Sequence, residues 1–259
     1  MKQKLVIKIG TSMVSNGDSI AIHRIENLCK LILDIRAKFD VILVSSGAVA
    51  TGFTRIKLDK SKLSNKRALA SIGQPLLMNA YDSIFRKHNI ITSQLLFIST
   101  IFDSEEKIAY AKDTLETLLA NGILPIFNEN DVIAQNDLTF GDNDQLSAYV
   151  AHYFNSNMLV ILSDVYGYYD KDPLKNKDAK LVKYVNKISQ DKISTNKIAG
   201  SEFATGGIVT KLIAANFLLN NNREMFLCSG FDLQPTLDFL INNNHYLGTL
   251  FSSKQGVEI

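Results

Sequence analysis

The residues best suited to chemistry in this 259-residue chain gather in one acidic stretch, FNENDVIAQNDLTFGDNDQLSA, at positions 127–148. From Asp113 to Asp170, nine acidic residues occur without a single Lys or Arg, so the rest of the chain carries +11 to give the net charge of +2. Carboxylates at this density repel one another unless positive groups face them in the fold. The stretch therefore predicts a site that receives a cationic group, and a solvated acidic surface loop is the alternative.

The neighbours of this stretch favour the functional interpretation. It follows an apolar run, GILPIF at 122–127, and it leads into an amphipathic run at 145–154. This order predicts a connection from a strand to a helix. In open parallel α/β sheets, ligands bind at the carboxyl ends of strands, where such connections lie. We therefore interpret the acidic stretch as an active-site loop.

Two more apolar runs end in short polar turns. The run at 4–9 breaks at Gly10-Thr11-Ser12, and the run at 41–44 leads into SSGAVA at 45–50. Free backbone N–H groups and hydroxyls at such turns suit a carboxylate or a phosphate, although small residues there are also typical of a plain tight turn. Lys8 interrupts the first apolar run. It is either a snorkelling edge residue or a buried cation aimed at an anion, and its sequence context favours neither.

A glycine pair opens the last long helical pattern of the chain. The segment ATGGIVTK at 204–211 precedes a helix that runs to about residue 221, and glycines before a helix are suited to cradling phosphates. The spacing does not match the P-loop pattern, and a Gly-Gly turn alone more often marks a helix entry. Between the acidic stretch and this segment, a strand at 158–162 delivers Ser163 and Asp164.

The scaffold that must position these turns is an alternation of strands and helices. Apolar periodicity predicts helices at 20–39, 66–87, 105–121, 145–154 and 233–240, with further strands at 90–97, 225–229 and 246–251. Polar, Lys-rich stretches at 54–65 and 171–192 predict connections. The pattern predicts an α/β fold, a three-layer α/β/α sandwich with a mostly parallel central sheet, in a single domain over residues 1–259.

Composition excludes several classes of protein. Near balance between 28 basic and 26 acidic residues gives no general attraction to nucleic acid or to anionic membranes. The longest apolar runs fall far short of the roughly 20 residues that a membrane span needs. Four scattered histidines disfavour a zinc site, and Cys29 and Cys228 predict two buried reduced thiols rather than a disulfide. We expect a cytoplasmic protein.

Five segments in this order and spacing resemble the amino-acid kinase family, and most closely its glutamate 5-kinase branch. They are KIGTS from Lys8, SSGAVATG from Ser45, NEND from Asn128, GDND from Gly141 and TGGIVTK from Thr205. The short stretches SIGQPLLM from Ser71 and GTLF from Gly248 are also similar to the family. The match covers essentially the whole chain. It implies the carbamate kinase-like fold, with an acceptor-binding lobe at about 1–155 and a nucleotide-binding lobe at about 156–259. Unlike many bacterial members, this sequence is expected to lack a carboxy-terminal PUA domain.

The resemblance also implies a reaction and its residues. ATP, with Mg²⁺, would phosphorylate the γ-carboxylate of L-glutamate, the first step of proline synthesis. Catalytic roles would fall to Lys8, Lys211 and Asp144, and no protein side chain is expected to ligate the metal directly. The acceptor would be bound by Ser46, Gly47, Ala48, Asn128, Asp131, Asp142 and Asn143. The nucleotide would be bound by Lys8, Gly10, Thr11, Ser163, Asp164, Thr205, Gly206, Gly207, Ile208, Val209, Thr210 and Lys211.

Family resemblance further implies a homo-oligomer, either dimer or tetramer, with proline as a feedback inhibitor and a glutamyl phosphate reductase as a partner. Residues 135–137 depart from the family pattern in the loop associated with proline, and LSDVYGYYDKDP at 162–173 departs from it near the nucleotide. Two alternatives stay open. One is another enzyme of the same fold, such as one like acetylglutamate kinase. The other is a non-catalytic nucleotide-binding relative, which should have lost one of the two lysines or Asp144.

Overall fold

The structure is a computed structural model that describes residues 2–134, 143–173, 175–193 and 207–259. Within these residues one sheet of nine strands runs through the molecule in the order β3-β4-β2-β1-β5-β7-β8-β6-β9. The strands are β1 (Gln3–Ile9), β2 (Phe39–Ser45), β3 (Thr92–Phe97), β4 (Leu124–Glu129), β5 (Met158–Ser163), β6 (Tyr184–Lys187), β7 (Glu224–Ser229), β8 (Thr249–Phe251) and β9 (Val257–Glu258).

The first six strands of that order are parallel, and β8 pairs antiparallel with β7. Strand β1 lies at the centre, between β2 and β5. Because side chains alternate along a strand, Leu5, Ile7 and Ile9 enter one apolar core and Val6 enters the other. Lys8 therefore lies on the same face of the sheet as Val6.

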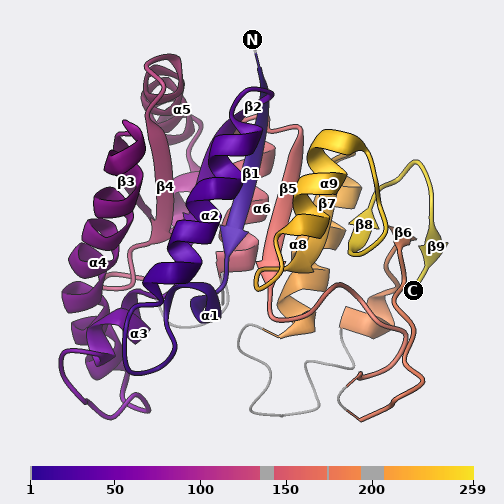
Figure 1. Ribbon diagram of the computed structural model, residues 1–259, viewed down its shortest axis with the longest axis horizontal. Helices are drawn as coiled ribbons and strands as arrows, with labels where there is room; N and C mark the ends of the chain where they lie inside the picture. The colour runs from indigo at the N-terminus through magenta and orange to yellow at the C-terminus, as the bar shows by residue number, and fades with distance from the viewer. Residues whose placement is uncertain (1, 135–142, 174, 194–206) are drawn as a thin grey trace.

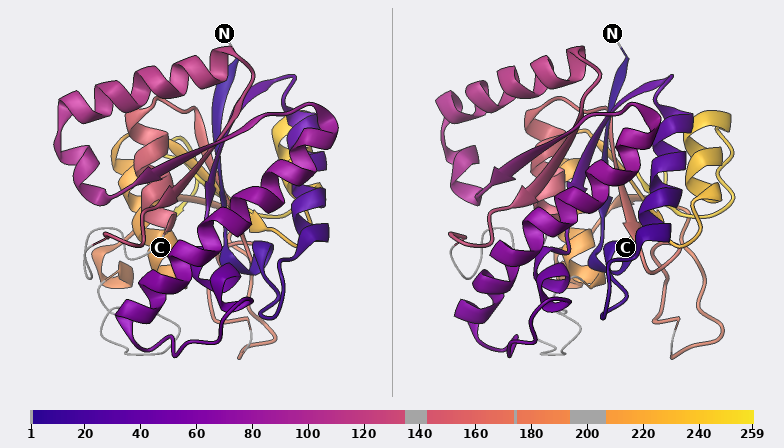
Figure 2. Two further views of the ribbon diagram at one scale, coloured as in Figure 1. Left: turned by 90° about the vertical axis from the view of Figure 1, so that its left-hand side faces the viewer. Right: turned by 60° about the vertical axis from the view of Figure 1, so that its left-hand side comes forward.

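Helices cover both faces of the sheet (Figures 1 and 2). The described helices are α1 (Thr11–Val14), α2 (Ile22–Ile35), α3 (Ala48–Phe53), α4 (Leu63–Phe85), α5 (Glu105–Ala120), α6 (Asn143–Tyr153), α8 (Ile208–Asn220) and α9 (Gln234–Asn242), with 3-10 turns η1 (Arg86–His88) and η2 (Ser99–Asp103). Buried residues of α2, α4 and α9 share one core, and those of α5, α6 and α8 share the other. The predicted three-layer sandwich with a mostly parallel sheet is confirmed.

Several predicted boundaries were wrong. The helix predicted at 20–39 ends at Ile35, and Phe39 already begins β2 because it pairs with Gln3 of β1. The strand predicted at 246–251 forms only from Thr249, after Gly248 takes a left-handed conformation with φ of 96°. Inside the predicted Lys-rich connection, β6 pairs with β8 and buries Val185 completely. Strand β6 has only four residues, of which Val185 alone is buried, so the strand is too short to show a period-2 pattern.

The structure also bears on the two cysteines and on membrane-spanning helices. Cys29 and Cys228 are both free and buried, as predicted. Within the part of the chain that the structure describes, no helix is long and apolar enough to cross a membrane.

Candidate active site

The parallel strands bring the predicted turns to one edge of the sheet. Backbone hydrogen bonds join the ends of neighbouring strands, from the Ser46 N–H to the Ile9 carbonyl at 3.1 Å and from the Gly10 N–H to the Leu162 carbonyl at 3.3 Å. The turns after β1, β2 and β5 are therefore adjacent, although their sequence positions are far apart. Figure 1 shows α1, α3 and the amino-terminal end of α8 at this edge.

A buried ionic cluster lies beside these turns. Asp144, in the first turn of α6, contacts the Nζ atom of Lys8 at 2.5 Å through Oδ1 and that of Lys211 at 3.2 Å through Oδ2. Lys8 is 3% exposed, Lys211 5% and Asp144 0%, so solvent does not screen these contacts. The structure thus resolves the ambiguity over Lys8, which is a buried cation and not an edge residue.

Asp144 is held ionised by its surroundings. Burial alone would raise the pKa of its carboxyl group, but Lys8 and Lys211 together hold that pKa below its usual value. The Thr210 hydroxyl donates a further hydrogen bond to Asp144 Oδ2 at 2.8 Å. Strand β1, helix α6 and helix α8 thereby meet at one carboxylate.

The acceptor-side residues form a second polar cluster. Asn143, adjacent to Asp144, donates from Nδ2 to the Ser45 carbonyl at 3.0 Å, to Ser46 Oγ at 3.1 Å and to Asn128 Oδ1 at 2.8 Å. These bonds fix the direction of the Asn143 amide. Its Oδ1 atom is buried and has no hydrogen-bond partner among the described residues. This oxygen is therefore available to accept a hydrogen bond from a ligand.

The turn between β2 and α3 has a backbone that only glycine adopts easily. Gly47 has φ of 107°, and a Cβ atom there would lie 2.2 Å from Val14 Cγ2. This close contact seats Gly47 against α1 and starts α3 at Ala48, which is buried. The predicted acceptor residues Ser46, Gly47 and Ala48 therefore lie in one rigid turn next to Asn143.

Sequence reasoning missed the support behind this cluster. Asn128 donates to Gln74 Oε1 of α4 at 2.7 Å, and Gln74 donates in turn to Gln94 of β3 at 2.9 Å. On the other side, Ser45 Oγ and the Tyr81 hydroxyl are hydrogen-bonded at 2.8 Å. The signal that could have identified Gln74 was the stretch SIGQPLLM, which resembles the family and places Gln74 next to Pro75 inside α4.

Asp131 lies just beyond the end of β4. Arg67 of α4 donates to the Ala134 carbonyl at 3.0 Å and so holds this turn against the helix. Burial raises the pKa of Asp131 to about 6, and among the described residues its carboxylate has no ion-pair or hydrogen-bond partner. An unpaired carboxylate in such surroundings gains most from a cationic ligand.

The nucleotide-side residues approach from the other half of the chain. Gly207 precedes α8, whose first turn presents Ile208, Val209 and Thr210. Within the part of the chain that the structure describes, no side chain caps the first turn of α8, so its backbone N–H groups suit a phosphate. Ser163 donates to Asp164 at the end of β5, and Thr11 is exposed at the turn after β1. Asp142, Thr205, Gly206 and residues 135–137 lie outside the described residues.

The acidic stretch is partly neutralised by lysines from elsewhere in the chain. Asp144 pairs with Lys8 and Lys211, and Glu116 pairs with Lys4. Among the described residues, no group of three or more His, Cys, Asp or Glu side chains is arranged to hold a metal ion.

Comparison with known proteins identifies the family of this chain. A model of the amino acid kinase family matches residues 3–229. The chain belongs to the amino acid kinase family. Among its curated relatives, a glutamate 5-kinase from Helicobacter hepaticus is 48% identical over 259 residues, covering 99% of this chain and 98% of the relative. A glutamate 5-kinase from Leishmania donovani is 46% identical over 252 residues, covering 97% and 96%. The resemblance to the glutamate 5-kinase branch is thus confirmed.

Solved structures of amino acid kinase relatives confirm the fold at low sequence identity. UMP kinase from Bacillus anthracis aligns with a TM-score of 0.64 at 19% identity, covering 98% of this chain and 97% of its own. Carbamate kinase from Giardia lamblia, bound to AMP-PNP, aligns with a TM-score of 0.63 at 16% identity, covering 97% and 98%. The carbamate kinase-like fold predicted from the sequence is therefore confirmed.

Proposed function

We propose that the chain is a glutamate 5-kinase, which transfers the γ-phosphoryl group of ATP to the γ-carboxylate of L-glutamate and yields γ-glutamyl phosphate and ADP. The observation that carries the proposal is the meeting of Lys8 and Lys211 at Asp144, where the turns after β1, β2 and β5 come together. Identity of 46–48% over nearly the full length of glutamate 5-kinases supports the choice of acceptor.

The lysines stabilise charge during the transfer. A γ-carboxylate is already ionised near pH 7, so the reaction needs no general base. As an oxygen of that carboxylate bonds to the γ-phosphorus and the bond to the β,γ-bridging oxygen breaks, negative charge spreads over the phosphoryl and bridging oxygens. Lys8 and Lys211 are positioned to donate to those oxygens in a water-poor site. Asp144 contacts both ammonium groups and holds them in place.

The acceptor cluster orients glutamate. In the proposal, the Ser46 to Ala48 turn donates to the α-carboxylate. The ammonium group of glutamate is the cation that the acidic loop requires, with acceptors from Asn143, Asn128 and Asp131, and with Asp142 as a further contact. The amide direction fixed at Asn143 leaves an acceptor there, which matches the N–H donors of an ammonium group.

The nucleotide is held by the other half of the chain in this proposal. Residues 205–211 and the Gly10-Thr11 turn face its phosphates, and Ser163 with Asp164 contacts the nucleoside side. Mg²⁺ supplies positive charge that neutralises the phosphate oxygens, and this cation commonly binds through phosphates and water with few protein ligands. Asp144 is already engaged by two lysines, so it does not fit the role of a metal ligand.

Further parts of the proposal come from the family resemblance. They are an acceptor lobe at about 1–155 and a nucleotide lobe at about 156–259, a homo-oligomer, inhibition by proline, and delivery of the product to a glutamyl phosphate reductase. An acyl phosphate is labile, so a reductase that consumes it nearby is chemically reasonable.

Trapping of the acyl phosphate tests the function. Purified protein is incubated with ATP, Mg²⁺, glutamate and hydroxylamine, and glutamyl hydroxamate is measured together with ADP. We expect both products with glutamate, neither with N-acetylglutamate, and both formed at least about 10²-fold more slowly by the Lys8→Ala variant. Hydroxamate formed preferentially from N-acetylglutamate would instead identify an acetylglutamate kinase, and absence of both products with either acceptor would reject the kinase assignment.

A further inference from the structure

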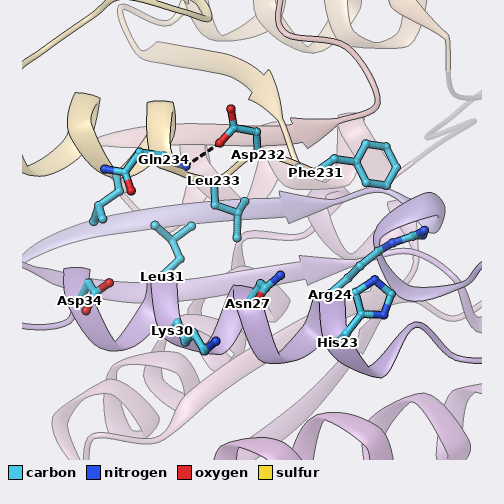
Figure 3. A pocket seen from close by; sticks show the side chains of 12 residues that line it. His23, Arg24, Asn27, Lys30, Leu31, Asp34, Phe231, Asp232, Leu233 and Gln234 are labelled. Carbon is cyan, nitrogen blue, oxygen red and sulfur yellow. Dashed lines mark hydrogen bonds between the residues drawn. The ribbon is translucent and has the colours of Figure 1, made fainter.

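Arg24 connects three elements beside the proposed phosphate turn, although no role at the site has been assigned to it. It lies in the first turn of α2, and its Nη1 atom donates to the Ser12 carbonyl at 2.5 Å and to the Ser15 carbonyl at 3.4 Å. The guanidinium carbon also lies 4.9 Å from the ring centroid of Phe231, in the loop after β7. Figure 3 shows the Arg24 side chain extending from α2 across the pocket towards the loop that carries Phe231.

The hydrogen bonds from Arg24 fall on helix α1, which needs support from outside the helix. Helix α1 has only four residues, and a helix of one turn is unstable on its own. Carbonyl groups in the last turn of a helix lack partners within it, and a cation there is favourable. Arg24 supplies the donor and the charge at once, because it bonds carbonyls inside α1 and just beyond it.

Helix α1 is also fitted tightly between the two halves of the site. A Cβ atom on Gly230, at the end of β7, would lie 2.3 Å from Met13 Sδ. On the other side, Val14 occupies the space that a side chain at Gly47 would need. A shift of α1 would therefore move the turn at Gly10-Thr11 relative to both Gly47 and the strand that carries Lys8.

Phe231 has an exposed fraction of 52%, which is high for a phenylalanine. A planar guanidinium packs over such a ring while its Nη1 atom donates to the two carbonyls, and the compact ammonium of Lys lacks the planar group for that ring contact. The ring therefore gives Arg24 a fixed platform on the nucleotide side, and Arg24 transmits that position to α1.

We infer that Arg24, braced by Phe231, is a positioning residue for phosphoryl transfer that fixes the Gly10 to Ser12 turn against the Lys8–Asp144–Lys211 cluster. The inference rests on the proposed function for its kinetic consequence. Misplacement of reacting groups by about 1 Å can cost on the order of 10² in rate. Loss of the guanidinium should therefore lower kcat by a larger factor than it raises the KM for ATP, and leave the KM for glutamate nearly unchanged.

The test compares Arg24→Ala and Arg24→Lys with the control Lys30→Ala, in the hydroxamate assay. Lys30 is a basic residue of the same helix, and it lines the same hollow of about 320 Å³ between α2 and the loop before α9 (Figure 3). We expect kcat to fall at least about tenfold in Arg24→Ala and less in Arg24→Lys, with Lys30→Ala unchanged. Because the hollow is open beside Arg24, added ethylguanidine should restore part of the Arg24→Ala activity.

Amide hydrogen exchange gives a readout that does not depend on the substrate. Exchange at residues 12–15 should accelerate in Arg24→Ala and in Phe231→Leu, but not in Lys30→Ala, in folded protein without ligands. Unchanged exchange there, or Arg24→Ala turnover within about threefold of wild type, would overturn the inference. If kcat fell in Arg24→Ala and ethylguanidine did not restore part of it, the inference would also be overturned, because Arg24 would then act only on the stability of the fold. If wild-type protein makes no hydroxamate yet exchange responds as expected, the proposed function fails and the positioning of α1 by Arg24 stands.

Discussion

Lys8 and Lys211 reach the two oxygens of one buried carboxylate from opposite ends of the chain. Two buried ammonium groups are costly to desolvate, and Asp144 brings one negative charge to the pair. An anionic ligand bound beside them would lower that cost further. The transferred phosphoryl group is that ligand in the proposed reaction.

Substitution of either lysine tests this role directly. In Lys8→Ala and Lys211→Ala, one donor to the phosphoryl oxygens is lost, so kcat should fall by ~10²–10³ or more. Asp144 keeps the other lysine as its partner in each variant, so we expect both to fold. The exposed Lys177→Ala substitution serves as the control and should leave turnover unchanged. Near-wild-type kcat in either active-site variant, measured by ADP release, would remove the lysine from the mechanism.

Asp131 should make glutamate binding depend on pH. Burial raises its pKa to about 6, so its carboxyl group is ionised and able to hold an ammonium group only above that pH. As pH falls from 7 to 5, the Kd for glutamate should rise, approaching tenfold per unit below pH 6, because the binding form disappears. Free glutamate stays mostly ionised over this range, because its γ-carboxyl pKa is about 4.3.

Calorimetric titration of glutamate into wild type and Asp131→Asn at pH 5, 6 and 7 measures this effect without turnover. The amide cannot ionise, so the variant should bind more weakly at pH 7 and with little change between the three values. Parallel pH dependence in the two proteins would show that another group titrates.

At the scale of elements, the acceptor turn depends on close contact between α3 and α4. A Cβ atom on Gly73 of α4 would lie 1.8 Å from the Ala48 carbonyl oxygen and 2.4 Å from the Gly52 backbone nitrogen. A Cβ atom on Gly52 of α3 would likewise lie 2.0 Å from the Leu69 carbonyl oxygen of α4. The two helices therefore touch backbone to backbone, and this contact fixes where Gly47 and Ala48 lie.

Gly73→Ala should disturb both stability and acceptor binding. Separation of α3 from α4 by the added methyl group should cost about 1–3 kcal/mol of unfolding free energy, as overpacking commonly does. The displaced turn should raise KM for glutamate more than KM for ATP. Ser71→Ala on the exposed side of α4 is the matched control and should change stability by less than about 0.5 kcal/mol. Equal stability of Gly73→Ala and wild type in urea denaturation would contradict the packing argument.

The sequence predicted the elements with strong periodicity and missed those without it. Buried parallel strands such as β5 were correct because nearly every residue is apolar. Strands β6 and β9 could not be predicted, since both are short and are ordered by pairing with distant strands. At the site, Lys8 could be placed only once the register of β1 and the positions of α6 and α8 were known.

Gln74 and Tyr81 were missed for a related reason. A polar residue in an amphipathic helix is ordinarily assigned to the solvent face, and only tertiary structure shows that Gln74 turns inward to Asn128. Motif resemblance identified the residues that would contact the ligands, whereas the residues that hold them in place carry little signal in a single sequence.

At the scale of the whole molecule, the parallel sheet gathers two sets of turns at one edge. Ser46, Asn128 and Asn143 lie on one side of β1, and Ser163, Asp164 and the start of α8 follow β5 and precede β7. Strand β1 separates the two sets and contributes Lys8 between them. This arrangement supports the proposed division into an acceptor lobe and a nucleotide lobe, with transfer occurring at their junction.

If the two lobes bind different ligands, glutamate and the nucleotide should each stabilise the protein independently of the other. A ligand at one hundred times its Kd adds about 2.7 kcal/mol to the unfolding free energy. For a chain of this size that is roughly 5–10 °C in Tm. Glutamate, and AMP-PNP with Mg²⁺, should each raise the Tm of wild type. In Ser46→Ala the shift with glutamate should shrink while the shift with AMP-PNP persists, and Asp164→Ala should show the reverse.

Differential scanning fluorimetry over a concentration series of each ligand measures both shifts. If either variant lost both shifts together, the acceptor and nucleotide would not occupy separate sets of turns, and the two-lobe division would have to be abandoned.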